Sequence, residues 1–391
     1  MKKIILLFTC LLCLVACQGE KRDMYTVQFY DLFDTVTTVA IPAKSQEEVK
    51  DLSDQIHEKF LHYHKLYDGY HTYPGMDNLK TINDQAGKSP VKVEDALFDL
   101  IQESIHRYKT QSKEVNIAMG SVLKIWSDYR DGFEAGADFQ DQDPNKEHKQ
   151  AQLPPMDQLQ EAAKHSNIDD IILNPEEKTV FLKDPKMALD LGAVAKGYAT
   201  EKIGQYIEED LKIDSALISA GGNVRLVGQP IEKDRKTFVI GIQNPDVLSE
   251  DNQGSNVLDA IKINDASIVT SGDYQRYYIV EGKKYHHLID PKTLMPGDYF
   301  RAVTVVTKDS GYADFLSTAV FLMPYEEGRK FVDGLDGVEA YWIMKDGQIH
   351  YTDGMDSLLT YHRKNIKEAE WLRTMSWALS TRFSWVFYFF S

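Results

Sequence analysis

The order of its apolar segments is the feature that most constrains how this chain folds. From Ile171 onward, short segments patterned like strands are separated by stretches with helical periodicity. The predicted strands include a hairpin, and they are 171–173, 180–182, 216–219, 238–242, 267–270 and 302–307. Because strands and helices do not alternate strictly, the pattern disfavours a doubly wound parallel sheet. The sequence predicts an α+β fold, either as one large domain or as two closely joined lobes.

The first third of the chain predicts a strand pair followed by helices. Residues 25–41 alternate apolar and polar side chains and are interrupted by Phe33-Asp34-Thr35. Ser45 and Glu48 have the spacing of a capping box, which predicts a helix start. A second helix is expected from about Glu94. Further along, a strand from Leu189 is expected to end in glycine and to lead into a helix over 195–208.

The first residues have the form of an export signal. Basic residues precede an apolar run from Ile4 to Ala16, which is too short to span a bilayer. The run ends Leu-Val-Ala-Cys and resembles a bacterial lipobox, in which the cysteine carries the lipid. We therefore expect a signal peptide over 1–16, a lipidated Cys17 and a tether over 17–24. The protein would then be anchored to the cell membrane on its extracytoplasmic face.

The positions of the cysteines and the negative net charge exclude several kinds of functional site. Cys10 and Cys13 would leave with the signal, so the folded body has no disulfide, cysteine metal site or thiol nucleophile. Loss of Lys2 and Lys3 would change the formal charge from −16 to −18. Such an acidic body argues against binding to nucleic acid, and attachment to the membrane is expected from acyl chains.

Two segments are expected to lie outside the packed body. Residues 131–155 are polar and acidic, which predicts a surface loop or insertion. Residues 360–391 hold three of the five tryptophans and end in an aromatic run, but Arg373 and Arg382 interrupt it, so it is no convincing membrane span. No function is assigned to this tail.

Asp314 and Thr318 are candidate metal ligands. They lie four residues apart at the head of an apolar helical pattern, so both side chains are expected on one helix face. A carboxylate and a hydroxyl suit Mg²⁺, which prefers oxygen ligands and shares phosphate ligands. The alternative is that Asp314 caps the helix and that Thr318 fills space.

Two further segments have features of phosphate sites. Residues 190–199 read Asp-Leu-Gly-Ala-Val-Ala-Lys-Gly-Tyr-Ala, so glycine and lysine occur where a helix is expected to start. Helix N-termini favour anions, and Lys196 would add a positive charge. Residues 219–224 place a Gly-Gly pair after a predicted strand. Such a pair either lets the backbone approach a ligand or only reverses the chain.

Together these segments resemble the ApbE family, the FAD:protein FMN transferases. The motifs are Asp-Leu-Gly-x-x-Ala-Lys-Gly-Tyr-Ala, Gly-Gly-Asn, Thr-Ser-Gly-Asp-Tyr, His-x-Ile-Asp-Pro and Ala-Asp-x-x-Ser-Thr-Ala. The resemblance covers about residues 25–353 and implies one transferase domain over 25–359 with an ApbE-like fold, mixed sheets and packed helices in two closely joined lobes. Where the family has methionine and aspartate, this chain has Phe33 and Asn116.

The resemblance implies a reaction and a set of site residues. Members split FAD with Mg²⁺, attach FMN to a Ser or Thr hydroxyl of an acceptor protein that carries a flavinylation motif, and release AMP. The implied magnesium ligands are the Ala193 carbonyl, Asp314 and Thr318. The implied FAD-binding residues are Phe33, Tyr73, Glu114, Val115, Asn116, Asp190, Lys196, Thr270, Ser271, Gly272, Asp273 and His287.

His287 is the candidate general base, because a neutral imidazole is available near neutral pH. A flavin contact is an equal alternative for it. Asp290 either orients His287 or caps the Asp-Pro turn, and His286 is expected to be structural. Three other functions remain open: a magnesium-dependent FAD pyrophosphatase, a flavin-binding lipoprotein without chemistry, and a solute-binding lipoprotein.

Overall fold

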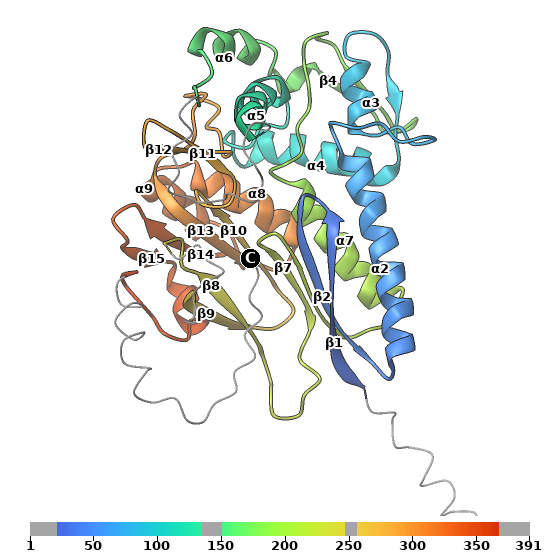
Figure 1. Cartoon of the computed structure of the whole chain (residues 1–391), viewed down its shortest axis with the longest axis vertical. Coiled ribbons are helices and arrows are strands. Elements are labelled where there is room, and N and C mark those ends of the chain that lie inside the picture. The colour runs from blue at the N-terminus through green and yellow to red at the C-terminus, as the bar shows by residue number, and fades with distance from the viewer. Residues whose placement is uncertain (1–21, 135–150, 247–255, 367–391) are drawn as a thin grey trace, which may run out of the picture.

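One large antiparallel sheet forms the centre of the molecule. The computed structural model describes residues 22–134, 151–246 and 256–366 of the 391-residue chain (Figure 1). The sheet has eight strands in the order β1-β2-β6-β7-β10-β13-β14-β15, and all neighbouring pairs are antiparallel. Their bounds are Asp23–Leu32, Thr35–Ala43, Ser215–Ala220, Asn223–Gly228, Ser267–Gly272, Phe300–Thr307, Glu339–Met344 and Ile349–Tyr351.

Three small sheets surround the large one. They are β3-β5-β4 (Val91–Lys92, Thr179–Leu182 and Ile171–Asn174), β8-β9 (Phe238–Gln243 and Val257–Ile263) and β11-β12 (Tyr277–Val280 and Lys283–His286). The helices are α2 Gln46–Tyr67, α3 Leu79–Asp84, α4 Asp95–Thr110, α5 Gly120–Glu134, α6 Met156–Ala163, α7 Ala195–Glu209, α8 Ser310–Phe321 and α9 Tyr325–Asp333. Short 3₁₀ helices span Ile168–Asp170 and Asp353–Ser357. The predicted α+β class is confirmed.

The two faces of the large sheet bury different cores. Val269 on β10 and Val303 on β13 contribute to the core that α2, α4, α7 and α8 cover. Ile268 and Ala302, one residue away on the same strands, contribute to the core beneath β8 and β9. This two-residue alternation decides which polar side chains of β10 face α8. A third, smaller cluster joins α5, α6, β11 and β12 near the top of Figure 1.

Side-chain caps set the starts of several helices. Ser45 Oγ accepts from the Glu48 amide at 3.2 Å, so the predicted start of α2 is confirmed. Glu48 Oε2 accepts from the Lys44 amide at 2.6 Å, one residue before the partner of a standard capping box. Asp309 Oδ1 caps α8 by accepting from the Tyr312 amide at 2.6 Å. The proposed capping role of Asp314 is therefore wrong, because Asp314 lies inside the helix.

Several sequence expectations need correction or lie outside the described residues. The strand expected from Leu189 is absent from the described structure: only an isolated bridge joins Ala188 to Met119. Helix α5 continues to Glu134, into the predicted insertion, and the segment 135–150 lies outside the described residues. The packed chain extends past residue 359, because the Ile366 amide bonds to the Gly347 carbonyl at 2.9 Å.

The expected membrane attachment concerns residues that the structure does not describe. The signal over 1–16, Cys17 and tail residues 367–391 lie outside the described ranges. Within those ranges, no helix has both the length and the apolar character that a membrane span requires.

Candidate functional site

The centre of the candidate site is the contact between α7 and α8. The Gly197 amide donates a 2.8 Å hydrogen bond to Asp314 Oδ2. Gly197 lies in the first turn of α7, where backbone amides have no acceptor within the helix. Because Asp314 supplies this missing acceptor, its carboxylate lies beside the first turn of α7. Asp314, one of the predicted magnesium ligands, thus lies at the start of α7, which begins two residues after Ala193.

A cluster of hydroxyls lies beside Asp314, one turn further along α8. Thr318 is buried, and its Oγ1 lies 3.4 Å from Ser271 Oγ of β10. Ser271 Oγ also lies 2.9 Å from Ser317 Oγ. These side chains meet because β10 packs against α8 and Ser271 faces that helix. Asp314 and Thr318 both lie in α8, four residues apart, and therefore share one helix face, as their spacing predicted.

Two charged groups accompany Asp314 at the start of α7. Burial raises the pKa of Asp314 and of Asp190, and it lowers the pKa of Lys196. The Lys196 charge acts in the opposite direction on both carboxylates. Among the described residues, no acidic side chain forms an ion pair with the Lys196 ammonium within 4.0 Å. The site therefore holds a partly desolvated cation beside acidic groups, which suits an anionic ligand.

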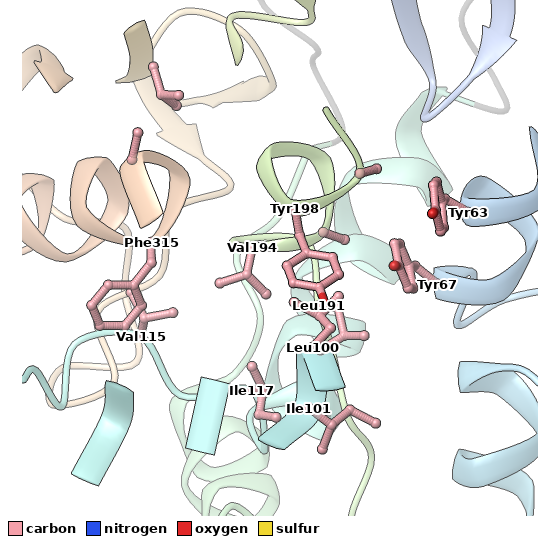
Figure 2. Close-up of a cluster of buried hydrophobic side chains, with 14 of the residues drawn as sticks. Tyr63, Tyr67, Leu100, Ile101, Val115, Ile117, Leu191, Val194, Tyr198 and Phe315 are labelled. Atoms are coloured by element: carbon pink, nitrogen blue, oxygen red, sulfur yellow. The ribbon is translucent and has the colours of Figure 1, made fainter. Parts of the chain in front are cut away.

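The turn before α7 is held by Asp190. Its Oδ1 accepts from the Gly192 amide at 2.8 Å, and its own amide bonds to the Ile117 carbonyl at 2.9 Å. The turn rests on the core shown in Figure 2, where Leu191, Val194 and Tyr198 pack with side chains of α4 and α8. This packing fixes the position of the α7 N-terminus, whose positive dipole end favours anions.

His287 is held in one tautomer by the carbonyl of Arg276. Its backbone amide and its Nδ1 both lie near the Arg276 carbonyl, at 3.1 Å and 3.3 Å. A carbonyl only accepts, so Nδ1 carries the proton and Nε2 has the free lone pair. Burial, followed by the charges of Arg276 and Lys196, lowers the pKa of His287 to about 3. The imidazole is therefore neutral at physiological pH.

The neighbours of His287 have structural roles. His286 is buried, and its Nε2 donates to the Gly297 carbonyl at 2.7 Å. Asp290 Oδ1 accepts from the Lys292 amide at 2.7 Å, which is the turn-capping alternative for this residue. The hydrogen bond of His286 agrees with the structural role expected for it.

The segments expected to line the far side of the flavin have defined anchors. The Tyr73 hydroxyl donates to Asp68 Oδ2 at 2.7 Å, and burial raises the pKa of Tyr73 to about 12. Asp68 also accepts from the amides of Tyr70 and His71. Phe33 occupies the turn between β1 and β2 with φ 52°. These contacts hold both aromatic side chains on ordered loops.

The Glu114–Asn116 segment is less accessible than expected. Val115 is 4% exposed and its side chain lies in the core of Figure 2, so only its backbone is available to a ligand. Asn116 donates to the Ser166 carbonyl and accepts from the Ala118 amide. Glu114 is buried and its Oε1 pairs with Lys292 at 2.5 Å.

The Thr270–Asp273 segment divides between the two faces of the sheet. Thr270 Oγ1 lies 2.8 Å from Thr304 Oγ1, on the face opposite Ser271, so its side chain points away from Asp314. Asp273 forms an ion pair with Arg301 at 3.1 Å. A methyl group on Gly272 would lie 2.5 Å from the Tyr274 ring. The structure thus brings Ser271 to the metal candidates but not the side chains of Thr270 or Asp273.

Sequence reasoning missed three residues at this site. Arg276 bonds to both the β1–β2 turn and His287, Asn223 adjoins Asp314, and Asp68 holds Tyr73. Asn223 follows the Gly221-Gly222 turn, whose φ values of 53° and 90° show a tight hairpin loop. The sequence did contain a signal for Asn223, because this residue belongs to the Gly-Gly-Asn motif. Nothing local marks Arg276, because its partner Phe33 is 243 residues away.

The oxygen donors of the site fit a hard cation. Within the described ranges, no cluster of three His, Cys, Asp or Glu side chains forms a metal cage. Asp314, Thr318 and the Ala193 carbonyl provide only oxygen atoms and one charged carboxylate. Mg²⁺ typically uses one or two carboxylates and completes its shell with water and substrate phosphates. The donor set fits Mg²⁺ bound together with a phosphate ligand.

Comparison with known proteins shows which family the chain resembles. The model of the ApbE family matches residues 33–342. A protein from Klebsiella pneumoniae named FAD:protein FMN transferase is 30% identical over 68% of this chain and 75% of its own length. One of the same name from Treponema pallidum is 29% identical over 71% and 73%.

Solved structures share the fold. The ApbE protein of Thermotoga maritima superposes with a TM-score of 0.70 and 23% identity, covering 86% of this chain and 99% of its own. The flavin transferase ApbE of Vibrio cholerae superposes with a TM-score of 0.68 and 19% identity, covering 86% and 100%.

Proposed function

The chain belongs to the ApbE family, and we propose that it transfers FMN from FAD to a Ser or Thr hydroxyl of an acceptor protein, with release of AMP. The names of its relatives support this activity. The observation that carries the proposal is the hydrogen bond between Gly197 and Asp314, because it holds a carboxylate, the magnesium ligand that we propose, beside the start of α7.

The reaction exchanges the phosphoanhydride bond of FAD for a phosphoester bond to the acceptor. The acceptor hydroxyl oxygen attacks the FMN phosphorus of the pyrophosphate, and the bond from that phosphorus to the AMP oxygen breaks. The hydroxyl proton passes to a base, and AMP leaves with the bonding electron pair. Phosphoryl transfer of this kind depends chiefly on positioning and on neutralising negative charge.

The residues at the α7–α8 contact would hold Mg²⁺. Asp314, Thr318 and the Ala193 carbonyl are the ligands we propose, in agreement with the donor chemistry. When bound, the ion neutralises charge on the pyrophosphate oxygens. Lys196 contributes a second positive charge, and the positive dipole end of α7 favours the phosphate groups. Asp190 keeps the turn in the conformation that presents these groups.

His287 is the group we propose to receive the hydroxyl proton. Its Nε2 is unprotonated because Nδ1–H is directed at the Arg276 carbonyl. Part of the depression of its pKa comes from the charges of Arg276 and Lys196. A bound pyrophosphate offsets these charges, which raises the imidazole pKa and makes it a better base when substrate is present. A flavin contact remains the alternative role.

We further propose that the enzyme is a lipoprotein on the extracytoplasmic face of the cell membrane. The support is the basic and apolar leader that ends at Cys17. The acceptor would then be an exported or membrane-bound protein with a Ser or Thr flavinylation motif. Membrane fractionation of the full chain and of Cys17→Ser tests the anchor: the variant is expected in the soluble extracytoplasmic fraction.

Intact mass of an acceptor protein tests the transferase. The body starting after Cys17 is incubated with FAD, MgCl₂ and an acceptor that carries the flavinylation motif. An acceptor mass gain of one FMN, release of AMP, and loss of both with a chelator are the expected results. Free FMN and AMP without a gain would identify a pyrophosphatase instead, and intact FAD would leave only flavin binding.

A further inference from the structure

The turn between β1 and β2 has an unfavourable backbone. Leu32 pairs with Thr35, so Phe33 and Asp34 form a two-residue hairpin loop. Both residues have φ 52°, the left-handed conformation that Asn-Gly sequences adopt readily. Side chains with a Cβ disfavour this conformation, and Phe33 disfavours it strongly. The local sequence therefore does not specify the turn by itself, so contacts from elsewhere must hold it.

Two distant residues bind the backbone of Phe33. Its amide donates to His64 Nδ1 of α2 at 3.1 Å, and its carbonyl accepts from Arg276 Nη2 at 3.3 Å. The Phe33 ring also lies edge-on to the imidazole of His64, with ring centroids 5.4 Å apart. Both backbone polar groups of this residue thus have partners outside the hairpin.

Arg276 links this turn to the candidate site. It lies between β10 and β11, and its carbonyl accepts from the backbone amide of His287. Among the described residues, no carboxylate lies within 4.0 Å of its guanidinium to form an ion pair. The Phe33 carbonyl is therefore a main partner of the Arg276 side chain. One residue thereby joins the β1–β2 turn to the loop that carries His287.

We propose that Arg276 is a positioning residue that holds the strained Phe33-Asp34 turn beside the site and thereby sets the affinity for FAD. This inference rests on the proposed function for its substrate. A second explanation is that Arg276 acts only through its positive charge on the pyrophosphate. The two explanations predict different FAD affinities when the turn is altered in a variant that lacks Arg276.

Arg276→Gln tests the position of the turn. The variant is expected to raise the KM for FAD about tenfold and to lower kcat less than about threefold, because ground-state binding is lost. The FAD dissociation constant, measured by flavin fluorescence without metal or acceptor, is expected to rise by a similar factor. Arg329→Gln is the matched control, because Arg329 also donates to a backbone carbonyl, that of Tyr351. It should leave both constants unchanged.

A second substitution, at Asp34, distinguishes anchoring of the turn by Arg276 from a direct effect of the Arg276 charge on FAD. Asp34→Gly removes the strain at φ 52° and is expected to return the KM of Arg276→Gln to within about threefold of the wild-type value. Asp34→Ala removes the same carboxylate but keeps a Cβ, so it should not restore binding. An unchanged KM in Arg276→Gln, or equal effects of Gly and Ala, would overturn the proposal. A wild-type protein that binds FAD without transferring FMN would refute the proposed function instead.

Discussion

Gly197 and Asp314 are 117 residues apart, and the amide of the first donates a 2.8 Å hydrogen bond to Oδ2 of the second. The approach is possible only because residue 197 has no side chain. A Cβ at that position would overlap the Cβ of Asp314 and the carbonyl of Ser310. The glycine of the Ala-Lys-Gly motif is thus required for the close contact between α7 and α8.

Gly197→Ala should separate α7 from α8. The added methyl group is expected to destabilise the fold by about 1–3 kcal/mol and to abolish most transfer, since Asp314 must move. Thermal unfolding and the acceptor mass assay measure the two effects. Gly334→Ala is the control, because its nearest heavy atom would be 3.5 Å away and no loss is expected. Wild-type activity in Gly197→Ala would show that the close contact is dispensable.

Asp314→Asn should remove metal binding but keep the fold. The Asn carbonyl can still accept from the Gly197 amide. The cost of burying a charged carboxylate, which raises the pKa of Asp314, is removed in the variant. We expect an unchanged or higher melting temperature and a loss of magnesium-dependent transfer of at least about 100-fold. Magnesium titration of the transfer rate measures this. Normal transfer by the variant would remove Asp314 from the ligand set.

Thr318 provides a matched pair of variants. Thr318→Ser keeps the hydroxyl near Ser271, whereas Thr318→Val keeps the shape and loses the oxygen. If Thr318 is a magnesium ligand, the valine variant requires about tenfold more Mg²⁺ for half-maximal transfer, and the serine variant is close to wild type. Identical magnesium requirements in the two variants would mean that Thr318 only packs.

His286 should make the stability depend on pH. Burial lowers its pKa to about 4, below the value of about 6.5 in an unfolded chain. Between pH 4 and 6.5, the unfolded state therefore binds a proton that the folded state does not. The stabilisation due to neutral His286 is complete above pH 6.5 and is lost as the pH falls towards 4. By proton linkage, the free energy of unfolding falls by about 3 kcal/mol over this range.

Urea unfolding between pH 4 and 7 checks this contribution. His286→Gln, which retains a donor for the Gly297 carbonyl, is expected to reduce the slope by about 1.4 kcal/mol per pH unit in that window. His287 stays intact in the comparison, so its own titration is common to both proteins. Equal slopes for the variant and the wild type would contradict a buried neutral His286.

Local sequence predicted those elements whose signals are contained within a few residues. The capped start of α2 at Ser45, the hairpin of β4 and β5, and helix α7 all follow from short patterns. The strand predicted from Leu189 is wrong: an apolar run before a glycine turn has the sequence pattern of a strand, but no strand forms there. In the structure that run packs as irregular chain, with the Leu189 amide bonded to Asn83 Oδ1 at 2.8 Å.

By itself the sequence determined the α+β class, the spacing that puts Asp314 and Thr318 on one face, and the motifs of the family. These depend on backbone period and residue order, which are local properties. Only the tertiary structure decided that Thr270 points away from Ser271, that Val115 is buried, and that Arg276 reaches Phe33. Such facts depend on which strands pair and which helices cover them, and contacts between distant segments settle that packing.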